Sequence, residues 1–505
     1  MNKLFSLTLF LAFFAGPLTA QEVRIPINID STVTTKSKVS IKGQLIPYTA
    51  TTGTQPVWDK EGKPIAGLYF TYYERSDVKD RSRRPLIISF NGGPGSASVW
   101  MHLAYTGPKI LKIDEEGFPV QPYGVKDNPH SILDVADIVF VNPVNTGLSR
   151  PVSTLSDKEV AEKFFGVNVD IEYLAGWVNT FVTRQNRWAS PKYLIGESYG
   201  TTRVSGLSLE LQDRHWMYLN GVILVSPTDL GLTRGDETAS ANILPYYTAA
   251  AWFHKKLSPE LQQRDLTDLL PEVEEYTINT LLPALAKGGS LAEQQRQEVA
   301  CQISQYAGIS EEVVLQHNLR VPKQFFWKEL LRDEGYTIGR LDSRYLGIDK
   351  TVAGDRPDYA AELTSWLHSF TPAINLYIKK HLNYNTDLKY NMFGPVRPWD
   401  NSNDNTGDDL RQAMAENPYL QLMVQSGYYD GATDYFNSKF NLWQMDPSGR
   451  LKERMRWEGY RSGHMMYLRN EDLETANEDI REFIIESTPS EGQPAKYLRE
   501  NARTK

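Results

Sequence analysis

The chain alternates between short apolar runs and longer segments whose apolar residues recur at helical spacing. Residues 85–90, 137–142 and 219–226 are apolar and rich in β-branched residues, as strands covered on both faces are. Between the second and third of these runs, Ile171, Leu174 and Trp177 recur three residues apart, which predicts an amphipathic helix. Strands that alternate with helices predict an α/β fold with a mostly parallel central sheet and helices on both faces.

The two ends of the chain extend this pattern. Residues 22–50 alternate apolar and polar positions and 66–74 are β-rich, so we expect antiparallel strands there. Residues 419–426 and 454–459 predict two further strands, and a last helix is expected over 471–486.

A helical segment interrupts the strand pattern. Helices are expected over four stretches with no convincing buried strand between them: 259–270, 273–286, 291–307 and 360–379. We interpret this region as a helical cap inserted over the functional edge of the sheet. The predicted organisation is a signal peptide (1–20), a first part of the core (21–230), the cap (231–415), a second part of the core (416–486) and a flexible tail (487–505).

Composition and charge exclude one class of partner. The chain has 505 residues, of which 41% are hydrophobic and 23% charged, so a sizeable core is expected. The formal net charge is −8 and no basic cluster of five or more residues occurs. We therefore expect no nucleic-acid partner, because proteins that bind nucleic acids need a basic surface to neutralise the phosphates.

The first twenty residues predict secretion. Lys3 precedes an apolar stretch over 4–15, and Leu18-Thr19-Ala20 is a plausible cleavage site. The apolar stretch is too short to span a bilayer, so we expect no membrane association after cleavage. Cys301 is the only cysteine, which excludes an intramolecular disulfide and favours the periplasm of a Gram-negative bacterium. Its neighbours predict a helix interior and a buried side chain.

Residues 191–200 contain the strongest chemical signal. A short apolar run, Tyr193-Leu194-Ile195, leads into Gly196-Glu197-Ser198-Tyr199-Gly200, and a helical segment follows. A strand, a G-x-S-x-G turn and a helix form the nucleophile elbow of a serine hydrolase. Ser198 is the predicted nucleophile.

A serine nucleophile needs a base and an acid that orients the base. In this fold class they follow the serine in the order acid, then histidine. His464 is the one histidine after the last predicted strand, where a loop at the carboxyl end of the sheet would hold a catalytic group. Asp430 follows the preceding strand; Asp434 is a rival that is more plausible as a helix cap.

The oxyanion hole needs two backbone N–H donors. One is expected from Tyr199, the residue after the nucleophile. The second is expected from the glycine-rich loop Asn91-Gly92-Gly93, which follows an early strand. No metal-binding or dinucleotide motif is present, so no cofactor is expected.

Four motifs together resemble the serine carboxypeptidases. They are Asn91-Gly-Gly-Pro-Gly-Ser-Ala-Ser98, Pro143-Val-Asn-Thr-Gly-Leu-Ser149, Gly196-Glu-Ser-Tyr-Gly200 and Gly463-His-Met465. The resemblance covers residues 85–467 and implies an α/β-hydrolase fold with a helical cap inserted before the strand that carries the catalytic Asp.

The resemblance also implies roles for single residues. It assigns the oxyanion hole to the Gly93 and Tyr199 amides, and recognition of the substrate's terminal carboxylate to Asn91, Gly92 and Glu197. A carboxyl binds a carboxylate only when one of them is protonated, so a preference for acidic pH is implied. Alternatively, Glu197 is an ordinary elbow residue with no role in binding.

The chain departs from the family pattern at three positions. Tyr105 stands where the family has a second Glu that pairs with the elbow Glu, and its phenol could donate to Glu197 or to substrate instead. Ser96 replaces a cysteine, and Asn145 replaces a glycine. Carboxypeptidase specificity is the part of the resemblance that these changes touch.

Three functional hypotheses remain. The first is a periplasmic serine carboxypeptidase acting on peptides through an acyl-enzyme. The second keeps the Ser-His-Asp triad but acts as an esterase, acyltransferase or peptidase without need of a free C-terminus. The third is a secreted binding protein on a hydrolase scaffold. Side-chain preference has no readable motif, and the aromatic clusters of the cap (246–247, 252–253 and 325–327) are a possible homodimer surface.

Overall fold

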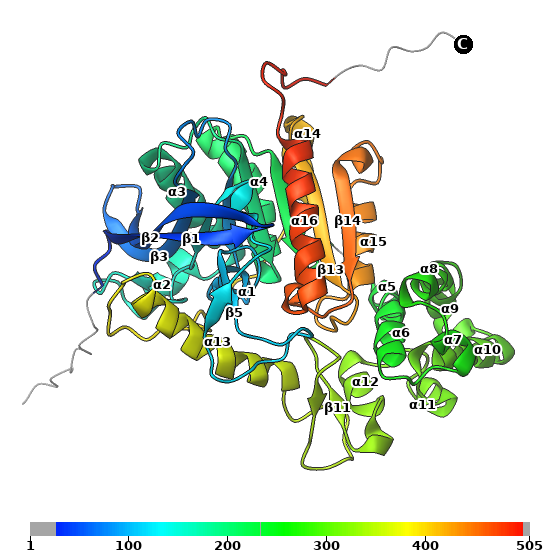
Figure 1. Cartoon of the computed structure of the whole chain (residues 1–505). Helices are drawn as coiled ribbons and strands as arrows, with labels where there is room; N and C mark the ends of the chain where they lie inside the picture. The colour runs from blue at the N-terminus through cyan, green and yellow to red at the C-terminus, as the bar shows by residue number, and fades with distance from the viewer. Residues whose placement is uncertain (1–26, 233, 498–505) are drawn as a thin grey trace, which may run out of the picture.

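The computed structural model describes residues 27–232 and 234–497. A twisted sheet runs through the molecule, with helices on both of its faces (Figure 1). The strand order is β1-β2-β3-β7-β4-β9-β10-β13-β14, and β8 pairs with β3. The strands from β7 to β14 are parallel, while β1, β2 and β3 are antiparallel to their neighbours. The predicted α/β-hydrolase fold class is confirmed.

The longer strands of the main sheet lie where the apolar patterns predicted them, whereas five strands of two or three residues were not predicted. The strands are β1 (Ser31–Ile41), β2 (Gln44–Trp58), β3 (Pro64–Arg75), β4 (Leu86–Phe90), β5 (Lys109–Leu111), β6 (Val125–Asp127), β7 (Asp137–Val141), β8 (Arg150–Pro151), β9 (Lys192–Glu197), β10 (Gly221–Val225), β11 (Thr337–Ile338), β12 (Leu346–Gly347), β13 (Gln421–Gly427) and β14 (Met455–Tyr460).

The helices fill the connections between the strands. They are α1 (Val99–Ala104), α2 (Asp157–Phe164), α3 (Val167–Arg184), α4 (Tyr199–His215), α5 (Asp236–Ala241), α6 (Leu244–Phe253), α7 (Pro259–Gln262), α8 (Leu266–Tyr276), α9 (Leu282–Lys287), α10 (Glu293–Ala307), α11 (Glu311–Gln316), α12 (Lys323–Glu329), α13 (Ala361–Lys380), α14 (Thr406–Glu416), α15 (Tyr435–Met445) and α16 (Asn470–Ser487).

Alternation along the buried strands creates a core on each face of the sheet. In β9, Leu194 joins the cluster formed with α3, α4 and α14, whereas Tyr193 and Ile195 join the opposite cluster with α1, α13 and α16. Successive residues of a strand point to opposite faces of the sheet, so a continuous apolar run supplies buried side chains to the cores on both faces. This explains why the central strands read as apolar throughout.

The cap has a hydrophobic cluster of its own. Its buried members run from Ala241 to Ile338, and the helices α5–α12 lie beyond β13 and β14 (Figure 1). The structure differs from the predicted cap boundary at residue 415. Helix α13 packs against α1 and contributes Trp366 and Phe370 to the core, and α14 packs on α4. Helical periodicity marks a buried face but does not show which core it faces.

The aromatic clusters of the insertion are mostly internal. Tyr246, Tyr247, Phe326 and Trp327 are buried in the cap, and the Tyr247 and Phe326 rings stack with centroids 3.9 Å apart. Phe253 is the one large exposed ring among them, with 38% of its surface accessible. The structural feature that suggested a dimer surface is therefore the core of the cap, because an insertion of this size needs apolar residues to pack on one another.

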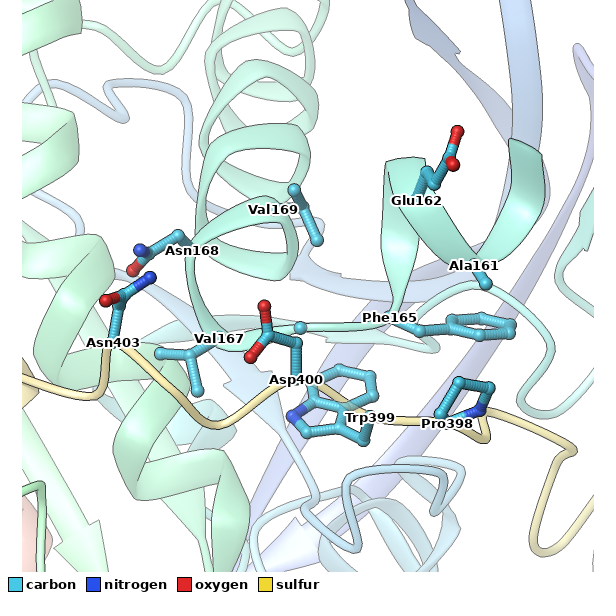
Figure 2. A pocket seen from close by; sticks show the side chains of 11 residues that line it. Ala161, Glu162, Phe165, Val167, Asn168, Val169, Pro398, Trp399, Asp400 and Asn403 are labelled. Carbon is cyan, nitrogen blue, oxygen red and sulfur yellow. The ribbon is translucent and has the colours of Figure 1, made fainter. Parts of the chain in front are cut away.

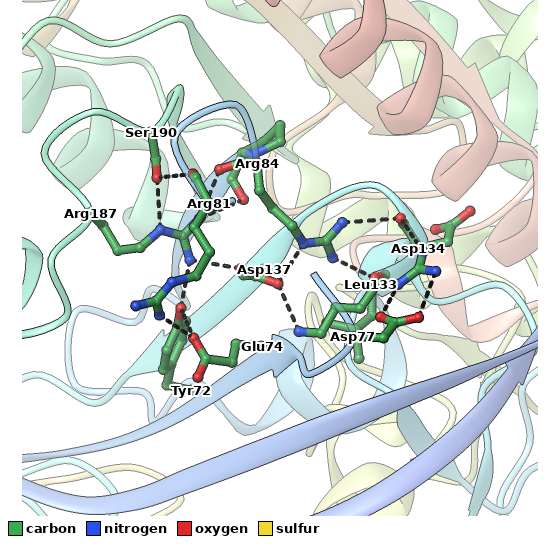
Figure 3. Close-up of polar contacts among 12 residues, drawn as sticks. Tyr72, Glu74, Asp77, Arg81, Arg84, Leu133, Asp134, Asp137, Arg187 and Ser190 are labelled. Atoms are coloured by element: carbon green, nitrogen blue, oxygen red, sulfur yellow. Dashed lines mark hydrogen bonds and ion pairs between the residues drawn. The ribbon is translucent and has the colours of Figure 1, made fainter. Parts of the chain in front are cut away.

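A buried ion-pair network lies at the amino ends of the parallel strands (Figure 3). Asp137, the first residue of β7, accepts from Arg84 Nε at 2.8 Å and from Arg187 Nη1 at 2.7 Å. Arg187 also donates to the Tyr72 hydroxyl at 2.6 Å. The network connects the residues before β4, the start of β7 and the loop after α3. It lies at the edge of the sheet opposite to the carboxyl ends of the parallel strands.

Three sequence expectations concern the chain ends and the cysteine. The predicted signal peptide lies outside the described residues. Cys301 lies in α10 as predicted, but its side chain is half-buried rather than buried. At the described end of the tail, the Tyr497 hydroxyl donates to Met414 O in α14 at 3.0 Å. Within the described ranges, no helix is long and apolar enough to cross a membrane.

Candidate active site

The turn between β9 and α4 has the geometry of a nucleophile elbow. Ser198 adopts φ +57° and ψ −127°, a conformation that costs free energy for a residue with a side chain. Strand and helix meet so closely that a Cβ on Gly196 would stand 2.1 Å from the Gly200 carbonyl oxygen. The glycines therefore permit the turn that presents Ser198 at the end of the sheet, where it is half-buried.

His464 and Asp430 are joined by a short hydrogen bond. The distance from His464 Nδ1 to Asp430 Oδ2 is 2.6 Å, and both side chains are buried. The other Asp430 oxygen accepts from the Ala432 and Thr433 amides, and the Thr433 hydroxyl donates to Oδ2 at 2.7 Å. Such bonds fix the carboxylate and so orient the imidazole.

Asp434, the rival acid, has a different role. Its side chain accepts from the Asn437 amide as the N-cap of α15, and it pairs with Lys323 at 2.8 Å. This is the capping role that the sequence suggested for it. The geometry favours Asp430 as the partner of His464.

The charge of Asp430 controls the protonation of His464. Burial alone would lower the pKa of this imidazole, but the carboxylate outweighs burial and the pKa of His464 is raised above its ordinary value. The backbone of His464 is also held, because its carbonyl accepts from Ser226 Oγ at 2.8 Å and its amide donates to the Leu341 carbonyl at 2.6 Å. The raised pKa makes the His464 imidazole a stronger base.

Sheet topology brings the three predicted triad residues to one edge. Ser198 follows β9, Asp430 follows β13 and His464 follows β14, and these strands lie on either side of β10 in the parallel part of the sheet. Among the described residues, no hydrogen bond joins Ser198 to His464. Catalytic hydrogen bonds often tighten only when substrate is bound.

The two predicted oxyanion loops pack directly against each other. A Cβ on Gly92 would lie 2.4 Å from the Tyr199 backbone nitrogen, and Gly93 has φ +106°, which favours glycine. Within the described part of the chain, the Gly93 and Tyr199 amides have no hydrogen-bond acceptor. Two free amides beside a serine can stabilise a developing oxyanion.

Glu197 is a buried carboxyl beside the nucleophile. Its Oε2 accepts from Asn91 Nδ2 at 3.0 Å and from the Tyr467 hydroxyl. Burial raises the pKa of Glu197 to about 7, and the nearby His464 opposes part of this effect. The side chain therefore keeps its proton across the acidic range, and the resemblance-based link between Asn91 and Glu197 has a direct contact behind it.

Tyr105 is not the phenol that contacts Glu197. Its hydroxyl donates to Gln425 Oε1 at 2.6 Å, and its ring stacks on Tyr467 with centroids 4.6 Å apart. The predicted contact of Tyr105 with Glu197 or substrate is wrong, because Tyr105 is fully buried behind Tyr467. Tyr467 was missed, although it stands three residues after His464 and carries a donor suited to a carboxyl.

A pocket of about 330 Å³ lies against helices α2 and α3 (Figure 2). It is bounded by the α2–α3 junction and the loop 398–403. Trp399 forms part of its wall, and the indole N–H donates to the Tyr199 hydroxyl at 3.1 Å. No predicted site residue lines this pocket, but one side chain connects it to Tyr199.

Over 27–232 and 234–497, no group of three or more His, Cys, Asp or Glu side chains could hold a metal ion.

The comparisons with known proteins agree with the motifs. Residues 49–276 match the family model of the serine carboxypeptidases. Serine carboxypeptidase-like 1 of Arabidopsis thaliana is 26% identical over 242 residues, which cover 47% of this chain and 51% of that protein. Serine carboxypeptidase-like 36 of the same plant is 28% identical over 171 residues, 32% of each chain. The matches thus span about half or less of the length of these curated relatives.

Among solved structures, a similar fold occurs in Kex1, a prohormone-processing carboxypeptidase from Saccharomyces cerevisiae. The TM-score is 0.51 at 12% sequence identity, over 87% of this chain and 92% of that one. At this identity the likeness concerns the fold. The similarity in fold covers more of the chain than residues 49–276, which the family model matches.

Proposed function

We propose that this chain, whose residues 49–276 match the family model of the serine carboxypeptidases, removes residues from the C-termini of peptides by way of an acyl-enzyme. The observation that carries this proposal is the buried Glu197 next to Ser198, bonded by Asn91, whose raised pKa allows it to hydrogen-bond a substrate carboxylate in its protonated form.

Acylation follows from the geometry of the triad. The Ser198 oxygen attacks the carbonyl carbon of the last peptide bond while His464 Nε2 takes the hydroxyl proton. Asp430 stabilises the imidazolium through its bond to Nδ1. The negative charge that develops on the carbonyl oxygen is held by the Gly93 and Tyr199 amides.

The second half of the reaction regenerates the enzyme. His464 gives its proton to the departing amine as the C–N bond breaks, and the acyl group stays on Ser198. A water molecule then loses a proton to His464 and attacks the ester. Collapse of this intermediate releases the shortened peptide, and the proton returns to the Ser198 oxygen.

Glu197 selects the peptide bond that is cleaved. Asn91 and Tyr467 both bond Oε2, and among the described residues no group donates to Oε1. A proton carried on Oε1 can therefore be donated to the terminal carboxylate of the substrate. Recognition of the free C-terminus places the last peptide bond at Ser198.

The decisive experiment compares two substrates. A blocked dipeptide with a free C-terminal carboxylate should be cleaved much faster than its C-terminal amide, measured as kcat/KM at pH 5. Ser198→Ala and His464→Ala should each lower kcat by roughly 10⁴-fold or more while folding normally, because each removes a member of the triad.

Two outcomes would replace the proposal. Equal cleavage of acid and amide would favour the esterase, acyltransferase or peptidase hypothesis on the same triad. A folded protein that neither cleaves peptides and esters nor reacts with a fluorophosphonate would favour the binding-protein hypothesis.

We also propose export to a periplasm with removal of residues 1–20. The support is the charged and apolar pattern at the start of the sequence together with a single cysteine. Expression of the whole chain in a Gram-negative host should give a periplasmic protein whose first residue is Gln21 by mass spectrometry. Recovery of the intact N-terminus in the cytoplasm would contradict the proposal.

A further inference from the structure

A buried arginine lies directly beneath the oxyanion loop. Arg203 is in the second turn of α4, five residues after Ser198, and only 1% of it is exposed. Its Nη1 donates to the Asn91 carbonyl at 2.6 Å and its Nη2 to the Pro94 carbonyl at 2.6 Å. One guanidinium therefore spans the loop that contains Gly92 and Gly93.

The same side chain is fixed from below. Arg203 Nε donates to Asp170 Oδ2 at 2.6 Å, and Asp170 is equally buried. Asp170 also accepts from the Tyr173 hydroxyl at 2.9 Å, and that hydroxyl accepts from the Val144 amide at 3.2 Å. The contacts join α3, α4 and the loops after β4 and β7 into one polar unit.

The direction of these bonds matters for catalysis. In a planar trans peptide the carbonyl and the N–H point in opposite directions. Arg203 draws the Asn91 carbonyl towards itself, and the Gly92 carbonyl lies 3.5 Å from Nη1. The N–H groups of Gly92 and Gly93 are consequently turned away from Arg203, and a positive charge on the carbonyl side strengthens them as donors.

We propose that Arg203, held by Asp170, is the positioning residue of the oxyanion hole. It acts through the loop and does not touch the reacting atoms. The guanidinium geometry is essential to this role, because its planar fork can bond Asn91 and Pro94 at once while a lysine ammonium is a single point charge. The inference rests on the proposed serine hydrolase chemistry but not on the carboxyl specificity.

The test uses Arg203→Lys and a matched control, Arg187→Lys. Arg187 is also fully buried, donates to a carboxylate at 2.7 Å and bonds backbone carbonyls, but it lies at the amino ends of the strands (Figure 3). The primary measurement is the rate at which a fluorophosphonate labels Ser198, because that reaction uses the oxyanion hole without Glu197. Thermal melting of each variant is measured alongside.

Arg203→Lys is expected to lower the labelling rate, and kcat for the free-acid dipeptide, by roughly 10²-fold, comparable to the loss of one oxyanion donor. Arg187→Lys should lower the melting temperature and leave both rates within about twofold. In Arg203→Ala, added guanidinium chloride at low concentration should restore part of the labelling rate. These results together would support a positioning role.

A folded Arg203→Lys that is labelled at the wild-type rate would overturn the proposal, as would equal rate losses in Arg203→Lys and Arg187→Lys. Should Arg203→Lys fail to fold, Asp170→Asn, which removes the negative charge that holds Arg203, must show the slowed labelling instead. Wild-type labelling without peptide cleavage would contradict only the carboxypeptidase proposal. A wild type that is not labelled at Ser198 would contradict both.

Discussion

At the scale of single residues, the proposed recognition of substrate depends on the proton of Glu197. Glu197 accepts from Tyr467, whose phenol keeps its proton because burial raises its pKa well above the ordinary value. A phenol can donate to the carboxyl but does not compete with it for protons in the acidic range. Glu197 thus titrates as a single acid, in contrast to a pair of carboxyls that shares one proton.

This arrangement predicts a bell-shaped pH dependence of kcat/KM for a free-acid dipeptide. Binding of the substrate carboxylate needs protonated Glu197, so activity should fall as pH rises through about 7. The reaction needs neutral His464, whose pKa is raised by Asp430, so activity should also fall towards acid pH. The measurement is kcat/KM from pH 4 to 9.

Glu197→Gln supplies the control for that profile. Its neutral amide cannot ionise, so the alkaline limb should disappear for the free-acid substrate while the acid limb remains. The C-terminal amide substrate should lack the alkaline limb even with the wild-type protein. An unchanged alkaline limb in Glu197→Gln would show that Glu197 does not recognise the carboxylate.

At the scale of elements, the strap formed by residues 339–345 joins the cap to the triad loops. The Leu341 carbonyl accepts from the His464 amide at 2.6 Å, and the Arg340 carbonyl accepts from the Gly431 amide at 3.0 Å. The strap is held in turn by Glu362 at the start of α13, whose Oε1 accepts from the Leu341 amide at 2.8 Å. The position of His464 thus depends on a segment that belongs to neither β13 nor β14.

Glu362 makes the stability of the protein depend on pH. Burial raises the pKa of Glu362 to about 7, with Asp342 adding to the effect and Arg340 opposing it, and its Oε2 has no partner among the described groups. The folded state therefore holds this proton up to about pH 7, while the unfolded state releases it near pH 4.3. Stability is lost as pH rises across this window, by about 3 kcal/mol.

Glu362→Gln should remove that part of the loss. The variant should unfold in urea with a free energy up to about 3 kcal/mol higher than the wild type at pH 8 and similar at pH 4. Glu197 gives a slope of the same sign, which the variant keeps. Glu293→Gln, at an exposed position of α10, serves as the control. Identical pH slopes in Glu362→Gln and the wild type would contradict this assignment.

At the scale of the whole molecule, stability and chemistry occupy different places. The ion pairs of Asp137 lie at the amino ends of the parallel strands, and the triad, the amides and Glu197 lie at the carboxyl ends. The cap packs on its own cluster and contacts the site through Asp434 and the strap. We expect the cap and the sheet to open as separate units, because each has its own core.

Phe326→Ala tests this division. Phe326 is fully buried in the cap, and removing its ring should cost about 3–5 kcal/mol locally. Amide hydrogen exchange should accelerate in α6, α10 and α12 while β4 and β9 keep wild-type protection. Uniform acceleration across cap and sheet would show a single cooperative unit instead.

The sequence by itself determined the main strands of the sheet and the order of the triad residues along the chain. The spacing of apolar residues and the local composition depend only on neighbouring positions in the chain. The apolar runs at 85–90 and 219–226 therefore predicted β4 and β10. The elbow at Ser198 also follows from adjacent residues, because glycine is needed where strand and helix meet. Chain order and strand ends were enough to propose Asp430 and His464, which the structure brings within 2.6 Å.

Only the tertiary structure decided which side chains support these residues. Tyr467 bonds Glu197 across 270 positions of the chain, and Arg203 reaches Asn91 across 112. Tyr105 and Tyr467 are alike as sequence letters, and their roles differ because one ring lies behind the other. Likewise, α13 has the same helical period as the cap helices but packs on the core. A periodic pattern fixes which face of an element is buried, whereas the partner of that face is set by the packing of the whole chain.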